Sequence, residues 1–229
     1  MDVHVEDRGA FSWVQVDLEG EEQFVSESGA MFRASTNIDI DVTTRGGGRG
    51  GILGGIGRSL AGESFFLSTY RSMDGRPGEV GLAPTHQGEI REIDLDGSAR
   101  WLCTGGSYLA SSRSLELDTS FQGLGGMLSG ESLSFMGVTG EGPLVVAAFG
   151  KLSEIEVDGN FTVDTGHVVA FEETLSYSIG KASGSFIQSF LAGEGLVLKF
   201  SGRGRVYVQS HNPDEFGQSL GSMLPPRRA

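Results

Sequence analysis

Apolar and acidic residues alternate along the chain and then give way to a glycine, and this pattern occurs three times. The segment Gly88-Glu-Ile-Arg-Glu-Ile-Asp-Leu-Asp-Gly97 recurs as Gly150-Lys-Leu-Ser-Glu-Ile-Glu-Val-Asp-Gly159, and a looser copy covers residues 11–20. Alternation with a period of two is typical of a β-strand with one buried face, and the closing glycine is typical of a turn. The pattern therefore predicts a strand followed by a turn at the same place in three units.

The rest of each unit repeats in the same order. An aromatic residue occupies one matching position in each unit, as Phe24, Trp101 and Phe161. A Leu-x-Gly-Glu sequence then precedes an apolar strand, and its three copies end at Glu63, Glu131 and Glu194. Repetition at this spacing indicates tandem units of short strands. Their boundaries lie at about 11–87, 88–149 and 150–209, with a tail at 210–229.

We expect an all-β fold in which residues 1–229 form a single domain of three tandem β-sandwich-like repeats. Each strand has an apolar face that must pack against another layer. A unit of about 60 residues is marginal alone, so the three are expected to pack around a shared pseudo-threefold axis. The tail is different, because Asn212-Pro213-Asp214-Glu215 begins like a capped helix and Pro225-Pro226 would end it. A short C-terminal helix is therefore predicted.

Residues 44–59 lengthen the first unit only and are rich in glycine and arginine. With apolar residues confined to 52–56, the segment is interpreted as a mobile loop. A Gly-x-Gly-x-x-Gly match at 46–51 lacks the strand–turn–helix context of a dinucleotide site. Arg45 and Arg49 suit an acidic neighbour or an anionic lipid surface, so a weak membrane-surface contact through this loop stays an alternative.

Composition and charge narrow the classes of function. The chain has 17 basic and 30 acidic residues and a net charge of −13, which disfavours binding to nucleic acid. Its apolar runs are far shorter than the roughly 20 residues of a membrane-spanning helix. The acidic start at residues 1–7 resembles neither a secretory signal nor a mitochondrial transit peptide, so we expect a cytoplasmic protein.

Outside the repeated glutamates, no arrangement of residues indicates catalysis or metal binding. The only cysteine, Cys103, occupies the slot of Ser26 and Val163, which predicts a small, half-buried and unreactive thiol. Ser219 lies in a Gly-x-Ser-x-Gly sequence, but no histidine follows it and the expected fold is not an α/β sheet. The histidines are scattered without the spacing of metal ligands: His4, His86, His167 and His211. We expect no enzymatic activity, no cofactor and no metal.

Two repeated sets of residues have a structural and a functional interpretation. Glu63, Glu131 and Glu194 can each accept backbone N–H bonds and fix a turn, or together they can form an oxygen-only cation site. The aromatic residues at the repeated strand position can each belong to the core, or they can line a ligand cavity. We favour the structural interpretation of both sets.

Four segments resemble one protein family. They are Leu60-Ala-Gly-Glu-Ser-Phe-Phe-Leu67, Leu82-Ala-Pro84, Gly166-His-Val-Val-Ala-Phe171 and Leu191-Ala-Gly-Glu-Gly-Leu-Val-Leu-Lys-Phe-Ser-Gly-Arg-Gly-Arg-Val-Tyr-Val-Gln209. Over roughly residues 20–225 the chain is similar to the family of the fungal altered-inheritance-of-mitochondria protein. Because the sequence shows no transit peptide, we expect a prokaryotic-type member of that family.

The resemblance implies a triplicated fold like that of the tryptophan RNA-binding attenuation protein superfamily, with no catalytic residues to transfer. RNA binding is not inferred from the fold, because fold does not determine function. We expect a non-enzymatic β-scaffold that acts through contacts with an unknown protein partner and forms a homo-oligomer. The alternatives are a small-molecule or cation-binding module and a peripheral membrane-associated organiser.

Overall fold

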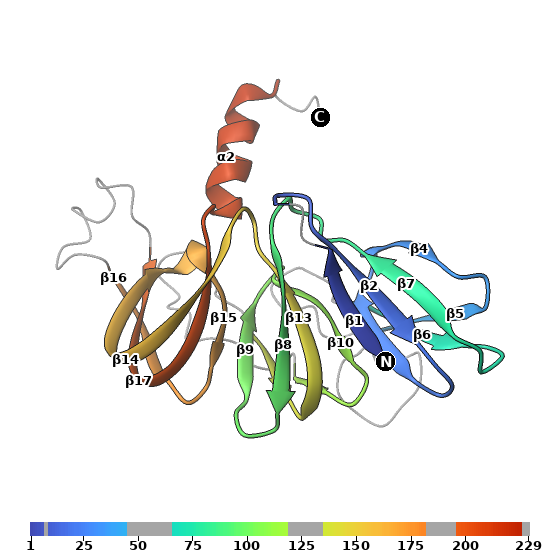
Figure 1. The fold of residues 1–229 in the computed structure, drawn as a ribbon. Coiled ribbons are helices and arrows are strands. Elements are labelled where there is room, and N and C mark those ends of the chain that lie inside the picture. The colour runs from blue at the N-terminus through green and yellow to red at the C-terminus, as the bar shows by residue number, and fades with distance from the viewer. Residues whose placement is uncertain (7–8, 45–65, 119–134, 182–195, 226–229) are drawn as a thin grey trace.

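The computed structural model describes residues 1–6, 9–44, 66–118, 135–181 and 196–225. It confirms the predicted all-β fold with a short C-terminal helix (Figure 1). The strands are β1 (Asp2–Glu6), β2 (Trp13–Leu18), β3 (Gln23–Glu27), β4 (Met31–Ala34), β5 (Ile38–Thr44), β6 (Phe66–Ser72), β7 (Gly78–Leu82), β8 (Ile90–Asp96), β9 (Trp101–Thr104), β10 (Tyr108–Ser112), β11 (Glu116–Asp118), β12 (Phe135–Thr139), β13 (Glu141–Ala147), β14 (Leu152–Asp164), β15 (Val168–Glu172), β16 (Ser176–Lys181) and β17 (Leu196–Gln209). A 3₁₀ turn, η1 (Thr165–His167), precedes β15.

Helix α2 (Pro213–Met223) begins as the sequence predicts. The side chain of Asn212 accepts hydrogen bonds from the backbone N–H groups of Asp214 and Glu215, at 3.0 and 3.5 Å. These bonds satisfy N–H groups that have no partner within the helix. The helix has no buried residue and projects from the β-sheets (Figure 1). The ring of Phe216 contacts Phe149, which lies between β13 and β14, and the two ring centroids are 5.1 Å apart.

The strands form three sheets, and two of these combine strands from neighbouring units. The order is β1-β2-β7-β4 in the first sheet and β5-β6-β3-β10-β13-β8 in the second. In the third it is β11-β12-β9-β15-β17-β14, with β16 also paired to β17. The ladder β3–β10 joins the first unit to the second, and β9–β15 joins the second to the third. In Figure 1 the three groups of strands lie side by side, with β4 at one end and β14 at the other.

Corresponding strands pair in the same way in each unit. In the third unit the single strand β14 takes the places of the first two strands, so β15 corresponds to the third strand of the other units. This third strand pairs antiparallel with the last strand of its unit, as β4–β7, β10–β13 and β15–β17. All three ladders contain one irregularity, and it lies at the matching place: between residues 31 and 33, 108 and 110, and 168 and 170. The predicted pseudo-threefold axis is not confirmed. In the described part of the chain, no ladder joins the third unit back to the first.

One predicted turn is wrong. Gly20 and Gly97 leave the strand with positive φ angles of 58° and 76°, as expected for turns. At Gly159 the backbone also has a positive φ angle, 114°, but β14 continues through it. Gly159 pairs with Gly202 of β17, and Gly202 has φ 113°. The paired glycines let two long strands pass together through a conformation that L side chains rarely adopt.

The buried side chains form three clusters, and each cluster combines residues of neighbouring units. The middle cluster contains Trp101, Cys103 and Tyr108 of the second unit, and also Val25 and Ala170 from its two neighbours. Strands at the junctions therefore contribute to two cores. All five residues of β10 are buried, because this strand is covered on both faces.

Cys103 is fully buried, so the predicted half-buried position is wrong. Its thiol lies in the middle cluster, and its strand is flanked by β12 and β15. Burial raises the pKa of the Cys103 thiol to about 12, because the thiolate cannot be solvated there. The prediction of an unreactive cysteine agrees with this environment.

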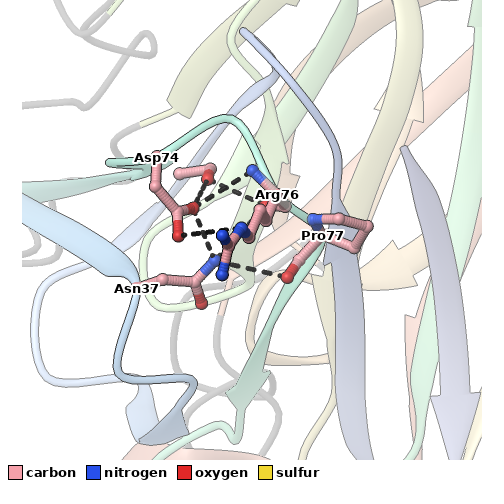
Figure 2. A network of polar contacts seen from close by, with 5 residues as sticks. Asn37, Asp74, Arg76 and Pro77 are labelled. Carbon is pink, nitrogen blue, oxygen red and sulfur yellow. Dashed lines mark hydrogen bonds and ion pairs between the residues drawn. The ribbon is translucent and has the colours of Figure 1, made fainter.

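A polar network fixes the turn between β6 and β7 (Figure 2). The Asn37 side-chain amide donates to Asp74 Oδ1 at 3.1 Å and to the backbone carbonyls of Arg76 and Pro77, both at 3.3 Å. Asp74 Oδ1 also accepts from the backbone N–H of Arg76 at 3.1 Å and from the Ser72 hydroxyl at 3.1 Å. The bond from Asn37, followed by that from the Arg76 backbone, lowers the pKa of Asp74.

We predict that Asn37→Ala lowers the free energy of unfolding by about 1 kcal/mol at neutral pH, through loss of these hydrogen bonds. Because the pKa of Asp74 is lowered in the folded state, its contribution is present above the ordinary aspartate pKa of about 3.9. It is lost as the pH falls through the lower folded value. The difference between wild type and variant in urea unfolding should therefore shrink in acid. Thr36→Ala, an exposed neighbour, is the control.

We also predict that Cys103 does not react with a thiol reagent such as DTNB at pH 8 in the native protein. In 6 M guanidinium chloride the same reagent should titrate one thiol per chain, since the sequence has one cysteine. Rapid labelling of the native protein would contradict the buried position.

Candidate functional site

The residues singled out from the sequence do not form a common site in the described structure. Glu63, Glu131 and Glu194 lie outside the described residues, as do residues 45–59 of the predicted loop. Phe24 and Trp101 are buried in two different clusters. Phe161 is 38% exposed at the surface of the third unit. The three aromatic residues therefore belong to separate places and line no shared cavity.

Each histidine has a local partner, which accounts for its position without a ligand. His4 Nε2 lies 3.3 Å from Asp17 Oδ2, and His167 Nδ1 lies 2.8 Å from the Gln209 carbonyl oxygen. His86 and His211 flank the ring of Phe149, with centroid distances of 5.4 and 5.2 Å. Among the residues that the structure describes, no group of three or more His, Cys, Asp or Glu side chains could hold a metal ion.

The most distinctive surface cluster lies on the outer face of the first sheet. Arg33 on β4 extends across β7 toward β2, and its guanidinium carbon lies 4.9 Å from the centroid of the Trp13 ring. The Trp13 ring meets the Phe32 ring edge-on, at 5.4 Å and an angle of 89°. Arg33 also forms an ion pair with Glu79 and donates to Gln15 Oε1 at 2.7 Å. We refer to these five residues as the Trp13 cluster.

A glycine on β7 makes this arrangement possible. Gly81 is paired with Arg33, and a Cβ at Gly81 would lie 2.6 Å from Arg33 Cγ and 2.9 Å from the Phe32 ring. Any other residue would have to displace both side chains. The matching positions on the last strands of the other units hold Val145 and Tyr207, and both are buried. Glycine therefore occupies this position only in the first unit, where the outer face of the sheet is exposed to solvent.

A hollow of about 270 Å³ lies beside the cluster. Its lining includes Phe11, Trp13, Phe32, Pro84 and His86. Phe11 is 70% exposed and Phe32 is 54% exposed, so large apolar side chains face solvent here. Adjacent exposed apolar residues of this kind are typical of a contact surface.

A second hollow, of about 220 Å³, lies between the units and is more polar. Its lining includes Thr104, Ser107 and Phe149. The Ser107 hydroxyl lies 2.8 Å from the Thr104 carbonyl oxygen and 2.7 Å from that of Val169, and the Thr104 hydroxyl lies 2.8 Å from the Val168 carbonyl oxygen. Both hydroxyls form hydrogen bonds to backbone carbonyl groups and so hold strands together. These bonds give the two polar residues a structural role.

The junction between the second and third units contains a related cluster, in which the Arg205 side chain is 40% exposed and that of Glu172 is mostly buried. Arg205 lies 5.0 Å from the centroid of the Trp101 ring, and its Nε donates to Glu172 Oε1 at 2.7 Å. Burial has the largest effect on the pKa of Arg205 and lowers it, but the hydrogen bond and charge of Glu172 raise the pKa overall. This cluster shows that an arginine can lie over an aromatic ring, paired with a carboxylate, at a junction between units of this fold.

Sequence reasoning missed the Trp13 cluster, although one signal was present. Arg33 occupies a position at which the other two units have alanine, Ala110 and Ala170. Those two alanines are buried and have a strand of the preceding unit beside them. A large charged residue at such a position indicates that no strand of the same chain covers it.

No helix in the described part of the chain is long and apolar enough to cross a membrane. The model of the mitochondrial biogenesis AIM24 family matches residues 3–211. The chain is 34% identical over 221 residues to the uncharacterized protein M6_Spy0233 of Streptococcus pyogenes serotype M6, covering 94% of this chain and 88% of that protein.

The crystal structure of protein SPYM3_0169 from Streptococcus pyogenes has a similar fold, with a TM-score of 0.80 and 32% sequence identity. The similarity covers 97% of this chain and 99% of that one. The match to nearly the whole length, at this identity, confirms the resemblance seen in the sequence. The chain belongs to the mitochondrial biogenesis AIM24 family.

Proposed function

We propose that the protein is a non-enzymatic β-rich scaffold that acts through protein contacts and associates with itself. The observation that carries the proposal is the exposed aromatic surface at one end of the molecule. Phe32 is 54% exposed, whereas Leu109 and Val169, which occupy its place in the other units, are buried. An apolar position that is covered in two units and open in the third is expected to be covered by a partner.

Helix α2 adds a second exposed apolar surface, suited to an additional protein partner. Phe216, Leu220 and Met223 are exposed, and their spacing of four and three residues puts them on one side of the helix. Leu224, directly after the helix, is also exposed. The net charge of −13 supports a protein partner over nucleic acid. A cytoplasmic location is part of this proposal.

A small-molecule module is the second candidate, and the hollow of about 270 Å³ beside Trp13 favours it. Ligand pockets are commonly lined by apolar and aromatic side chains. The two candidates differ in what covers this surface. A scaffold requires a protein there, whereas a binding module should melt at a higher temperature with an aromatic or cationic ligand present.

We predict that the purified full chain has a mass in solution that is a multiple of the single-chain mass. Size-exclusion chromatography with light scattering at micromolar concentrations measures this directly. The expected cause is burial of the exposed aromatic residues between copies. A single-chain mass up to about 100 μM, roughly the range of weak transient complexes, would contradict self-association.

A further inference from the structure

The two junctions inside the chain follow one rule. At the first, Ala110 of β10 pairs with Ser26 of β3, Ser111 with Val25, and Ser112 with Phe24. The second junction has the same pattern between β15 and β9. Its pairs are Ala170 with Cys103, Phe171 with Leu102, and Glu172 with Trp101. Both junctions join the second strand of one unit to the third strand of the next, with the same stagger.

The same two kinds of edge are left over at the ends of the molecule. Strand β4, the third strand of the first unit, is the last in its sheet and pairs only with β7 in the described structure. Residues 161–164 of β14, the counterpart of the second strand, pair with β17 on one side. In Figure 1 these two edges lie at opposite ends of the row of units. One chain therefore presents both halves of a third junction without joining them.

We infer that a second copy of this chain completes this junction: β4 of one copy pairs antiparallel with residues 161–164 of the next copy, in the register used twice within the chain. In that register Arg33 lies opposite Val163, Ala34 opposite Thr162, and Ser35 opposite Phe161. The inference rests on the proposed self-association and assigns the surface that mediates it. The contact is head-to-tail, so copies form a ring if the rotation closes and a filament if it does not.

The exposed aromatic residues fit this arrangement at both ends. Phe161 is 38% exposed, but Phe24 and Trp101, at the matching position of the other units, are buried beneath a completed sheet. At the other end, Trp13 is half-buried, whereas the matching Ile90 and Leu152 are buried. Joining the two ends would cover both surfaces at once, because the sheet that forms lies over the third unit's core.

Arg33 can be accommodated because it has its own partners. Its charge is paired with Glu79 within the first sheet, and its guanidinium lies against the Trp13 ring. At the second junction Arg205 has similar partners, since it lies over Trp101 and is paired with Glu172, with its side chain 40% exposed. Burial of Arg33 would therefore leave no unpaired charge. An unpaired buried charge is strongly destabilising, and this arrangement avoids it.

Disulfide trapping tests the register. Ala34 and Thr162 are both exposed, and directly opposed residues in an antiparallel pair are close enough for a disulfide. We predict that A34C and T162C, mixed and oxidised with diamide, give a covalent dimer on a non-reducing gel that dithiothreitol reverses. Each variant oxidised alone should remain a single chain on the gel, because residue 34 does not face residue 34 of a second copy and residue 162 does not face residue 162. Buried Cys103 does not compete.

Dimer formation by either variant alone, or none in the mixture, would overturn the head-to-tail register. If the wild-type chain is then still oligomeric by light scattering, self-association stands and only the assigned surface is wrong. If the wild-type chain is a single chain, both the proposed function and this inference are wrong.

A charge substitution tests the same surface without oxidation. We predict that Phe32→Asp reduces the wild-type oligomer to single chains at the same concentration, since it puts an unpaired carboxylate into the junction. Met73→Asp is the matched control, because Met73 is 62% exposed in the β6–β7 turn, outside the proposed contact. Unchanged circular dichroism shows that each variant is folded. An oligomer that survives Phe32→Asp, or one lost equally in Met73→Asp, would contradict the assignment.

Discussion

Antiparallel pairing between neighbouring units is the interaction on which the rest of this structure depends. The ladders β3–β10 and β9–β15 turn strands of two units into one continuous sheet. Each shared sheet then covers a core on both faces, which is why every residue of β10 is buried. A unit of about 60 residues is only marginally stable alone, and shared sheets increase the surface that each unit buries. The units are therefore interdependent, and the clusters around Trp101 and Phe171 cannot be assigned to one unit each.

The sequence was sufficient to predict the strands, the all-β class and the C-terminal helix, because those depend on local patterns. Period-two alternation shows which face of a strand is buried, and Asn212 before Pro213 marks a helix start. The alternation does not show which strand pairs with which, since strand pairing is set by contacts between residues far apart in the sequence. For this reason the sequence could not predict that the ladders β3–β10 and β9–β15 join neighbouring units. Gly159 is a local case: a positive φ angle makes a turn at Gly97 but continues a strand where a second glycine is opposite.

The Trp13 cluster was unpredicted for a related reason. Trp13 and Arg33 are 20 positions apart, and their contact depends on Gly81, which lies in a strand between theirs. Each residue is unremarkable in its own segment. The useful signal was comparative: a position that is alanine in two units and arginine in the third. A break in an internal repeat thus identifies the place where the environment differs, even when it does not show what that environment is.

The same break has a thermodynamic consequence for assembly. At the junctions inside the chain, Ala110 and Ala170 are covered at no electrostatic cost, and the units are already linked by the backbone. Covering Arg33 and Glu79 requires removing an ion pair from water, and that cost offsets part of the gain from burying the aromatic rings. Contact between copies should therefore be weaker than contact between units, and it should respond to salt and concentration. A charged residue on an open edge also disfavours pairing with unrelated strands. In the proposed assembly, Arg33 would make the exposed edge selective for a partner strand that leaves its pairing with Glu79 intact.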